Sequence, residues 1–154
     1  LNKPYKETDE FYQFLNFVND HNDLIPFRTE WRIYDESHNI AGTIDLLVNN
    51  NNGTFDIYDW KRSKKIVTPY NGELIEKDSW GNRAIGILKH LDDTSYNRYK
   101  LQQNLYKYIL EKRYDIEIKN MYLIVMHTEE GYNNYHKVKV PSLTNEIENI
   151  LQVL

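Results

Sequence analysis

Residues 40–61 read IAGTIDLLVNNNNGTFDIYDWK, and this stretch predicts the centre of the fold. Residues 40–48 and 54–61 are short runs rich in β-branched and aromatic side chains, and the NNNNG between them is a strong turn signal. We therefore expect two antiparallel strands joined by a tight loop. A strand over residues 29–35, followed by a polar turn at 36–39, extends this unit to an antiparallel meander of three strands.

Helices are expected before and after this meander. In residues 8–19 four apolar side chains recur at helical spacing, namely Phe11, Phe14, Leu15 and Val18. Residues 96–113 carry a second helical pattern, with Thr94 or Ser95 as the N-cap. The expected apolar face of this second helix consists of Leu101, Leu105, Tyr108 and Ile109.

The remaining residues predict a mixed sheet with helices packed against it. Residues 120–127 are apolar on both faces, as in a central strand, and residues 134–140 form another strand. A last helix follows Pro141 and Ser142. Residues 66–93 stay unassigned because prolines and glycines interrupt any long element. The predicted fold class is α/β or α+β, a mixed central sheet in which helices flank the antiparallel meander, in one domain over residues 1–154.

Composition excludes several classes of protein. Of the 154 residues, 40% are hydrophobic and 27% are charged, which is typical of a globular domain and not of a disordered chain. The absence of cysteine excludes disulfides and thiolate metal sites, and no apolar run approaches the ~20 residues that span a bilayer. We expect an intracellular protein that does not enter a membrane. Because the chain begins at Leu1, we expect a processed chain or a fragment of a longer protein.

Three side chains of the meander form a pattern typical of phosphodiester chemistry. Asp45 and Asp59 lie in apolar runs on neighbouring strands, and Lys61 shares a face with Asp59 because side chains alternate along a strand. Two carboxylates can hold a divalent cation, and a lysine beside them can position a water or offset charge on a phosphate. The alternative is an exposed ion pair between Asp59 and Lys61, worth roughly 0–1 kcal/mol. The triplet EIK at 117–119 has the same acid-x-lysine form, but no carboxylate lies on a strand and turn before it.

As a set, the segments GTID at 42–45, DWK at 59–61 and QQNLY at 102–106 resemble the motifs of the PD-(D/E)XK nuclease superfamily. The RecB/Cas4-like branch is the most similar, because it combines an acidic strand and a D-x-K strand with a downstream Gln-x-x-x-Tyr helix. The resemblance covers residues 30–106 and implies a restriction-endonuclease-like core. It also implies a deoxyribonuclease that depends on Mg²⁺ or Mn²⁺, as an exonuclease or another DNA-processing nuclease of repair or recombination.

The resemblance implies a role for each matching residue of the strands. Asp45 and Asp59 would bind the metal together with the backbone carbonyl of Trp60, and Lys61 would be the catalytic lysine. Glu30, on the strand before Asp45, lies where the family frequently has an upstream acid that faces the metal. The alternative for Glu30 is a solvated residue paired with a neighbouring arginine.

Two further residues come from the second expected helix. Gln102 and Tyr106 lie one helical turn apart and share a face, so that they can reach the active site or a substrate phosphate with neutral hydrogen-bonding groups. The alternative is an amphipathic helix in which both side chains border the core. The family's helical acid or histidine further upstream has no convincing counterpart, although Glu10 and His21 lie in that region.

A basic run follows the strand that carries the catalytic lysine. It comprises Arg62, Ser63, Lys64 and Lys65 and is expected, with Tyr106, to guide a DNA backbone towards the metal. The alternative is a solvated loop, and the net charge of −4 argues against binding by bulk electrostatics. The expected substrate is DNA that is single-stranded or has a free end, with a helicase or recombination protein as the partner. The alternative function is a catalytically inactive nuclease-like domain that binds DNA or a protein.

Overall fold

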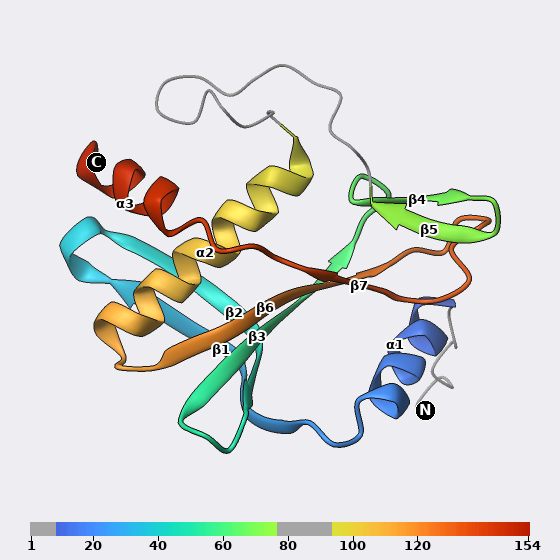
Figure 1. Ribbon diagram of the computed structural model, residues 1–154, viewed down its shortest axis with the longest axis horizontal. Coiled ribbons are helices and arrows are strands. Elements are labelled where there is room, and N and C mark those ends of the chain that lie inside the picture. Colours follow the sequence, from blue (N-terminus) through green and yellow to red (C-terminus); the bar gives the residue numbers. More distant parts are fainter. Residues whose placement is uncertain (1–8, 77–93) are drawn as a thin grey trace, which may run out of the picture.

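The computed structural model describes residues 9–76 and 94–154, which form a mixed five-stranded sheet with helices on both faces (Figure 1). The strand order is β1-β2-β3-β6-β7, and a separate two-stranded sheet consists of β4 and β5. In chain order the elements are α1 (Asp9–Asp20), β1 (Ile25–Asp35), the short 3₁₀ helix η1 (Glu36–His38), β2 (Ile40–Asn49), β3 (Thr54–Arg62), β4 (Val67–Tyr70), β5 (Glu73–Glu76), α2 (Ser95–Arg113), β6 (Glu117–Met126), β7 (His136–Lys139) and α3 (Thr144–Gln152).

The predicted fold class and its antiparallel meander are confirmed. β1 pairs antiparallel with β2, and β2 pairs antiparallel with β3. β1 begins at Ile25, earlier than the sequence pattern indicates, and Thr94 is the N-cap of α2 because its hydroxyl accepts from the Asn97 N–H. Part of the unassigned stretch forms the hairpin β4–β5, and residues 77–93 lie outside the described residues.

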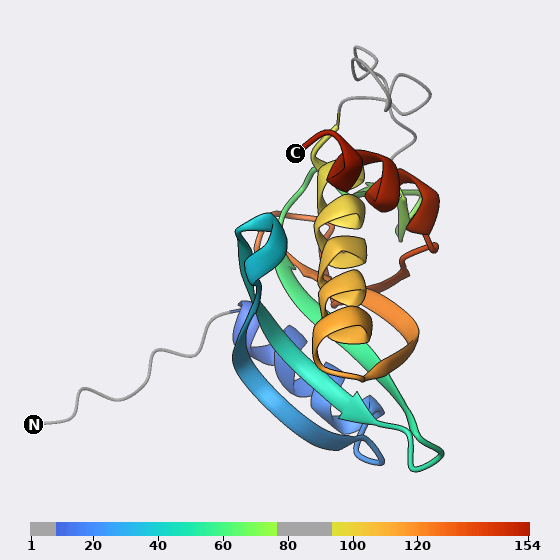
Figure 2. The same cartoon turned by 90° about the vertical axis from the view of Figure 1, so that its left-hand side faces the viewer.

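A crossover connection adds β6, the fourth strand of the sheet. β3 and β6 run parallel, and their pairing extends from Thr54 opposite Glu117 to Arg62 opposite Met126. The helix α2 lies between these two strands in the chain. Two parallel neighbours need such a connection, because a tight turn cannot join them. α2 and α3 cover one face of the sheet and α1 lies against the other, as Figures 1 and 2 show. None of the helices within the described ranges is long and apolar enough to cross a membrane.

Each face of the sheet has its own apolar core. Under α2 the core includes Leu47, Ile57 and Leu123, all of which are almost fully buried. Under α1 a smaller cluster consists of Phe17, Leu46, Val48, Tyr58 and Ile124. The sheet is therefore buried on both sides along β3 and β6, which explains the long apolar runs of these strands.

The predicted apolar face of α1 is largely wrong, because of its four residues only Phe11 is half-buried and the others are exposed. The buried residues of α1 are Gln13 and Phe17, whereas Phe14, Leu15 and Val18 are 37%, 37% and 43% exposed. Gln13 is buried because its side chain pairs with main-chain groups of the loop after β6. Its amide nitrogen donates to the carbonyls of His127 and Tyr132 at 2.8 Å, and its oxygen accepts from the His127 N–H at 3.1 Å.

The predicted face of α2 is also only partly correct. Ile109 is buried, but Leu101 and Leu105 are half-buried, and the helix buries Gln103 and Asn104. The Gln103 side chain donates to the carbonyl of Tyr122 on β6. The Asn104 side chain donates to the carbonyl of Pro141 and accepts from the Leu143 N–H, both in the segment that leads to α3. Buried amides of this kind tie a helix to main-chain groups that strand pairing leaves free.

The turn between β1 and β2 is held by a buried carboxylate. Asp35 is 1% exposed and lies 2.6 Å from Nδ1 of His38, and it accepts from Ser37 and, at 2.8 Å, from Nε of Arg113 on α2. Burial alone would raise the pKa of Asp35, but the hydrogen bonds from His38, Ser37 and Arg113 outweigh burial and hold this pKa at about 2. This cluster fixes the outer end of the meander against the last turn of α2.

We predict that Asp35→Asn lowers the free energy of unfolding by about 1–3 kcal/mol at neutral pH, because it weakens several hydrogen bonds to a buried charged group. A carboxylate whose pKa is lowered by folding stabilises the native state above its unfolded pKa and loses that effect as the pH falls towards 2. The difference between wild type and variant should therefore shrink from pH 7 to pH 3 in urea denaturation. Glu36→Gln, an exposed carboxylate in the same turn, is the control and should change little. A difference that does not depend on pH would contradict the role assigned to the charge.

Candidate active site

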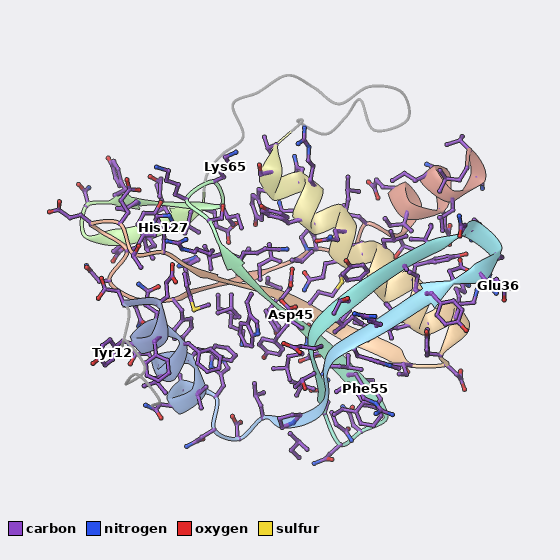
Figure 3. All side chains as sticks on the ribbon, turned by 180° about the vertical axis from the view of Figure 1, so that it is seen from behind. Tyr12, Glu36, Asp45, Phe55, Lys65 and His127 are labelled. Atoms are coloured by element: carbon purple, nitrogen blue, oxygen red, sulfur yellow. The ribbon has the colours of Figure 1, made fainter. Side chains whose placement is uncertain are left out.

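The candidate active site lies where β2 and β3 separate. The two strands pair from Asn49 and Phe55 up to Leu46 and Tyr58, and the next residues, Asp45 and Asp59, lie beyond the last pair. There Oδ2 of Asp45 accepts from the backbone N–H of Trp60 at 2.9 Å. The carboxylate thus replaces the strand partner that this N–H would otherwise need. Figure 3 shows the labelled Asp45 at this point of separation.

The backbone is irregular on the other side of Asp45 as well. The β1–β2 ladder pairs Thr29 with Leu46 and Trp31 with Ile44, and the intervening Glu30 has a φ of 46°, in the left-handed region. Ile44 belongs to the core under α2, whereas Leu46 belongs to the cluster under α1. Side chains two apart on a regular strand share a face, so β2 changes face at Asp45. A non-glycine residue at positive φ is strained, and such strain gathers at functional sites.

Asp59 and Lys61 share a face of β3, as predicted, and their side chains meet. Nζ of Lys61 lies 2.9 Å from Oδ2 of Asp59, and it donates to Oε1 of Gln102 on α2 at 3.4 Å. Nζ also lies 4.4 Å from the centroid of the Tyr99 ring, which is a cation–π contact. The side chains of Lys61 and Asp59 are 19% and 14% exposed, so this pair is largely shielded from water.

The two carboxylates influence each other's charge. Burial raises the pKa of Asp59, and a hydrogen bond with the neighbouring Asp45 raises it further. The ammonium of Lys61 lowers the pKa, and the balance places it at about 7. Lys61 is therefore the cation that offsets the acidity of this pair, and the raised pKa lets Asp59 keep its proton near neutral pH.

Tyr106 lies against the GTID segment at residues 42–45. A Cβ built on Gly42 would lie 2.6 Å from Cζ and 2.8 Å from the hydroxyl oxygen of Tyr106, so only glycine leaves room for this ring. Burial raises the pKa of Tyr106, and the charge of Asp59 adds to that rise. The hydroxyl keeps its proton near neutral pH, and its oxygen accepts a hydrogen bond from the backbone of Thr43.

The oxygen donors of the site suit a hard divalent cation. Asp45 and Asp59 supply carboxylates, and the Trp60 carbonyl points to the same side of β3 as the Trp60 N–H, which means towards Asp45. Mg²⁺ accepts such a small set and fills its other positions with water and phosphate. Glu30 is exposed, and within residues 9–76 and 94–154 no three His, Cys, Asp or Glu side chains are grouped to hold a metal.

The basic run after β3 is partly neutralised by acids. Nε of Arg62 pairs with Glu10 of α1, and Lys64 lies 3.6 Å from a carboxylate oxygen of Glu129. Ser63 accepts from the backbone N–H of Lys65, which shapes the turn. Exposed ion pairs contribute little to stability, so these cations can still exchange their partners for phosphates.

Tyr99 is a functional candidate that the sequence analysis missed. It lies three residues before Gln102 and seven before Tyr106, so all three residues are on one face of α2. This helical spacing is a signal that could have identified Tyr99. Its contact with Lys61 crosses from α2 to β3 and becomes visible only in the tertiary structure.

Comparisons with known proteins give only a weak likeness. No family model matches the chain, and no curated protein matches it. Eleven chains among the solved structures match, and one is a protein of Eubacterium rectale that is provisionally named an exonuclease. That match has a TM-score of 0.49 and 10% identity, and it covers 93% of this chain but 50% of the other, so this chain spans about half of that protein. A likeness of this size assigns neither a family nor an activity.

We predict that the free energy of unfolding of the metal-free protein falls as the pH rises from about 4 to about 7, because Asp59 loses its proton in this range. A carboxyl whose pKa is raised by folding stabilises the native state while it is protonated, and this effect disappears as the pH passes the folded pKa. The free energy of unfolding should fall by at most about 1.4 kcal/mol per pH unit in this range. Asp59→Asn should flatten this part of the profile in urea denaturation with EDTA. An unchanged profile in Asp59→Asn would show that another group titrates.

Proposed function

We propose that this chain is a divalent-metal-dependent nuclease of the PD-(D/E)XK kind that cuts DNA. The observation that carries the proposal is the meeting of Asp45, Asp59 and Lys61 where β2 and β3 separate, with Gln102 of α2 within reach of Lys61. The acid-x-lysine triplet alone is common, but the carboxylate on the neighbouring strand and the contact from the Gln-x-x-x-Tyr helix are independent of it.

The topology supports the same function. A three-stranded meander, a crossover helix and a fourth strand parallel to β3 form the core that the sequence resemblance implies. Three motifs that are spread over residues 42–106 lie together in this arrangement. Because α2 returns over the face of the sheet that carries Lys61, a distant helix completes a site that begins on two neighbouring strands.

Each residue has a distinct role in this proposal. Asp45 and Asp59, with the Trp60 carbonyl, would hold Mg²⁺ or Mn²⁺, and the bound cation would supply positive charge and lower the pKa of a water. Lys61 would hold the attacking water or offset charge on the phosphate, and Gln102 would keep the ammonium of Lys61 in place. The metal role of Glu30 stays a prediction.

The substrate is the less constrained part of the proposal. Tyr106 offers a neutral hydrogen-bonding group beside the carboxylates, and the basic run of Arg62, Ser63, Lys64 and Lys65 begins at the last residue of β3 and continues into the loop after it. Contacts of this kind position a phosphate backbone without reading its sequence. We propose DNA with an unpaired or free end, cut in an exonucleolytic or other processing reaction of repair or recombination. A helicase or recombination protein would then deliver the strand.

We predict that Lys61→Ala and Asp59→Ala each lower Mn²⁺- or Mg²⁺-dependent cleavage of end-labelled linear single-stranded DNA by at least about 100-fold. Both variants remove a charge that acts in the transition state. Lys119→Ala is the matched control, because Lys119 is exposed and belongs to the triplet of the same form at 117–119. It should cleave like the wild type.

The same assay distinguishes a nuclease that needs a free DNA end from one that cuts within a strand. If closed circular single-stranded DNA is spared, the enzyme depends on a free end. Cleavage that persists in Lys61→Ala and Asp59→Ala would show that the activity comes from another site or from a contaminant.

A nuclease-like domain that binds without cutting is the second candidate. It is favoured by one observation, that the described residues place only two carboxylates together. Such a domain would bind DNA or a protein through the same surface with no need for a metal.

Calorimetry separates these two candidates. We predict that the wild type binds Mn²⁺ and that Asp45→Asn weakens this binding by at least about 10-fold, because one of two carboxylate ligands becomes a neutral amide. Asp23→Asn, which changes an exposed carboxylate after α1, is the control. Equal Mn²⁺ binding by all three proteins would favour the domain that does not cut.

A further inference from the structure

A cavity of about 430 Å³ lies on the α1 side of the sheet, between α1, the first half of β1 and the separated part of β2 and β3. Its walls are largely apolar and aromatic, with Phe14 and Phe17 from α1 and Trp60 from β3. The ring of Trp60 meets those of Phe14 and Phe17 edge to face, at 5.6 Å and 5.0 Å between centroids. We call this space the α1 cavity.

The α1 cavity also has polar lining residues and adjoins the candidate active site. These residues include Thr29, Glu30 and Asp45 from the strands and His21 and Asn22 from the turn after α1, and Asp45 is also the carboxylate that bonds the Trp60 N–H. Trp60 itself stands between Asp59 and Lys61 in the chain, with its side chain on the opposite face of β3. A molecule in the cavity would therefore lie directly behind the strand that handles the phosphate.

The mouth of the cavity exposes apolar side chains. Phe14 and Val18 are 37% and 43% exposed. They remain exposed although the adjacent Gln13 holds α1 against the loop after β6 through hydrogen bonds to the carbonyls of His127 and Tyr132. Exposed aromatic surface beside a concave pocket is a common sign of a binding site. The carboxylates of Glu30 and Asp45 would repel a phosphate, whereas the aromatic walls suit a neutral flat group that donates hydrogen bonds.

We propose that the α1 cavity binds one unpaired nucleobase of the DNA strand that the active site engages. The proposal rests on the proposed function for the identity of the strand. The base would stack or lie edge-on against Trp60 and Phe14, with an exocyclic amino group towards the carboxylate of Glu30 or Asp45. A paired base in a duplex has both faces and one edge covered and cannot enter, so the cavity selects single-stranded or frayed ends.

The test is a binding measurement that needs no cleavage. The probes are an oligo-dC strand of about ten nucleotides and a fully abasic strand with the same phosphates, each followed by fluorescence anisotropy in EDTA and again in Ca²⁺. We expect the wild type to bind oligo-dC at least about fivefold more tightly than the abasic strand, as stacking of a single base provides. Phe14→Ala removes one wall and Val18→Trp fills the mouth, and both should abolish this preference.

Leu15→Ala is the matched control, because Leu15 follows Phe14 on α1 and is also 37% exposed but does not line the cavity. It should keep the preference. The proposal is overturned if the wild type shows no preference for bases or no binding, if Phe14→Ala and Val18→Trp retain the preference, or if Leu15→Ala loses it as well.

The failure of the base site and the failure of the proposed nuclease activity give different results. If a base preference disappears in Phe14→Ala while no variant or wild type cleaves DNA, the cavity is a base site on a domain that does not cut. If cleavage depends on Lys61 but binding ignores the bases, the nuclease stands and the base site is wrong.

Discussion

The hydrogen bond from the Trp60 N–H to Asp45 is the contact on which the candidate active site depends. β2 leaves β3 after Leu46 and Tyr58, and a strand that loses its neighbour leaves unpaired main-chain groups behind. The Asp45 carboxylate satisfies one of these groups and is itself fixed in position by doing so. Since Trp60 lies between Asp59 and Lys61, the same bond places all three charged side chains relative to one another.

This arrangement holds charges together at an energetic cost. The high pKa of Asp59 reflects burial and a second carboxylate close by, and Lys61 is the cation that offsets them. The rest of the structure keeps Lys61 from turning away, with Gln102 accepting from its ammonium and the Tyr99 ring lying beside it. The parallel pairing of β3 with β6 continues past the separation point to Arg62, so β3 keeps one paired neighbour where the other is missing.

Buried amide side chains explain where the sequence patterns were wrong. Helical periodicity in α1 and α2 indicated faces built from Phe14, Leu15, Leu101 and Leu105, because polarity in a sequence normally indicates exposure. The helices instead bury Gln13 and Gln103, whose amides bond carbonyls at the end of β6 and within it. A pattern of residue types does not show which main-chain groups a sheet leaves free, and those groups decide which face of the helix is buried.

The sequence by itself determined the meander, the fold class and the pairing of an acidic strand with an acid-x-lysine strand, because these depend on residues close together in the chain. The alternation of side chains along β3 is enough to place Asp59 and Lys61 on one face. Only the tertiary structure decided that Tyr99 contacts Lys61, that Tyr106 packs over Gly42 and that a cavity opens behind Trp60. These features depend on where α1 and α2 cross the sheet, and the crossings are set by contacts between residues far apart in the chain.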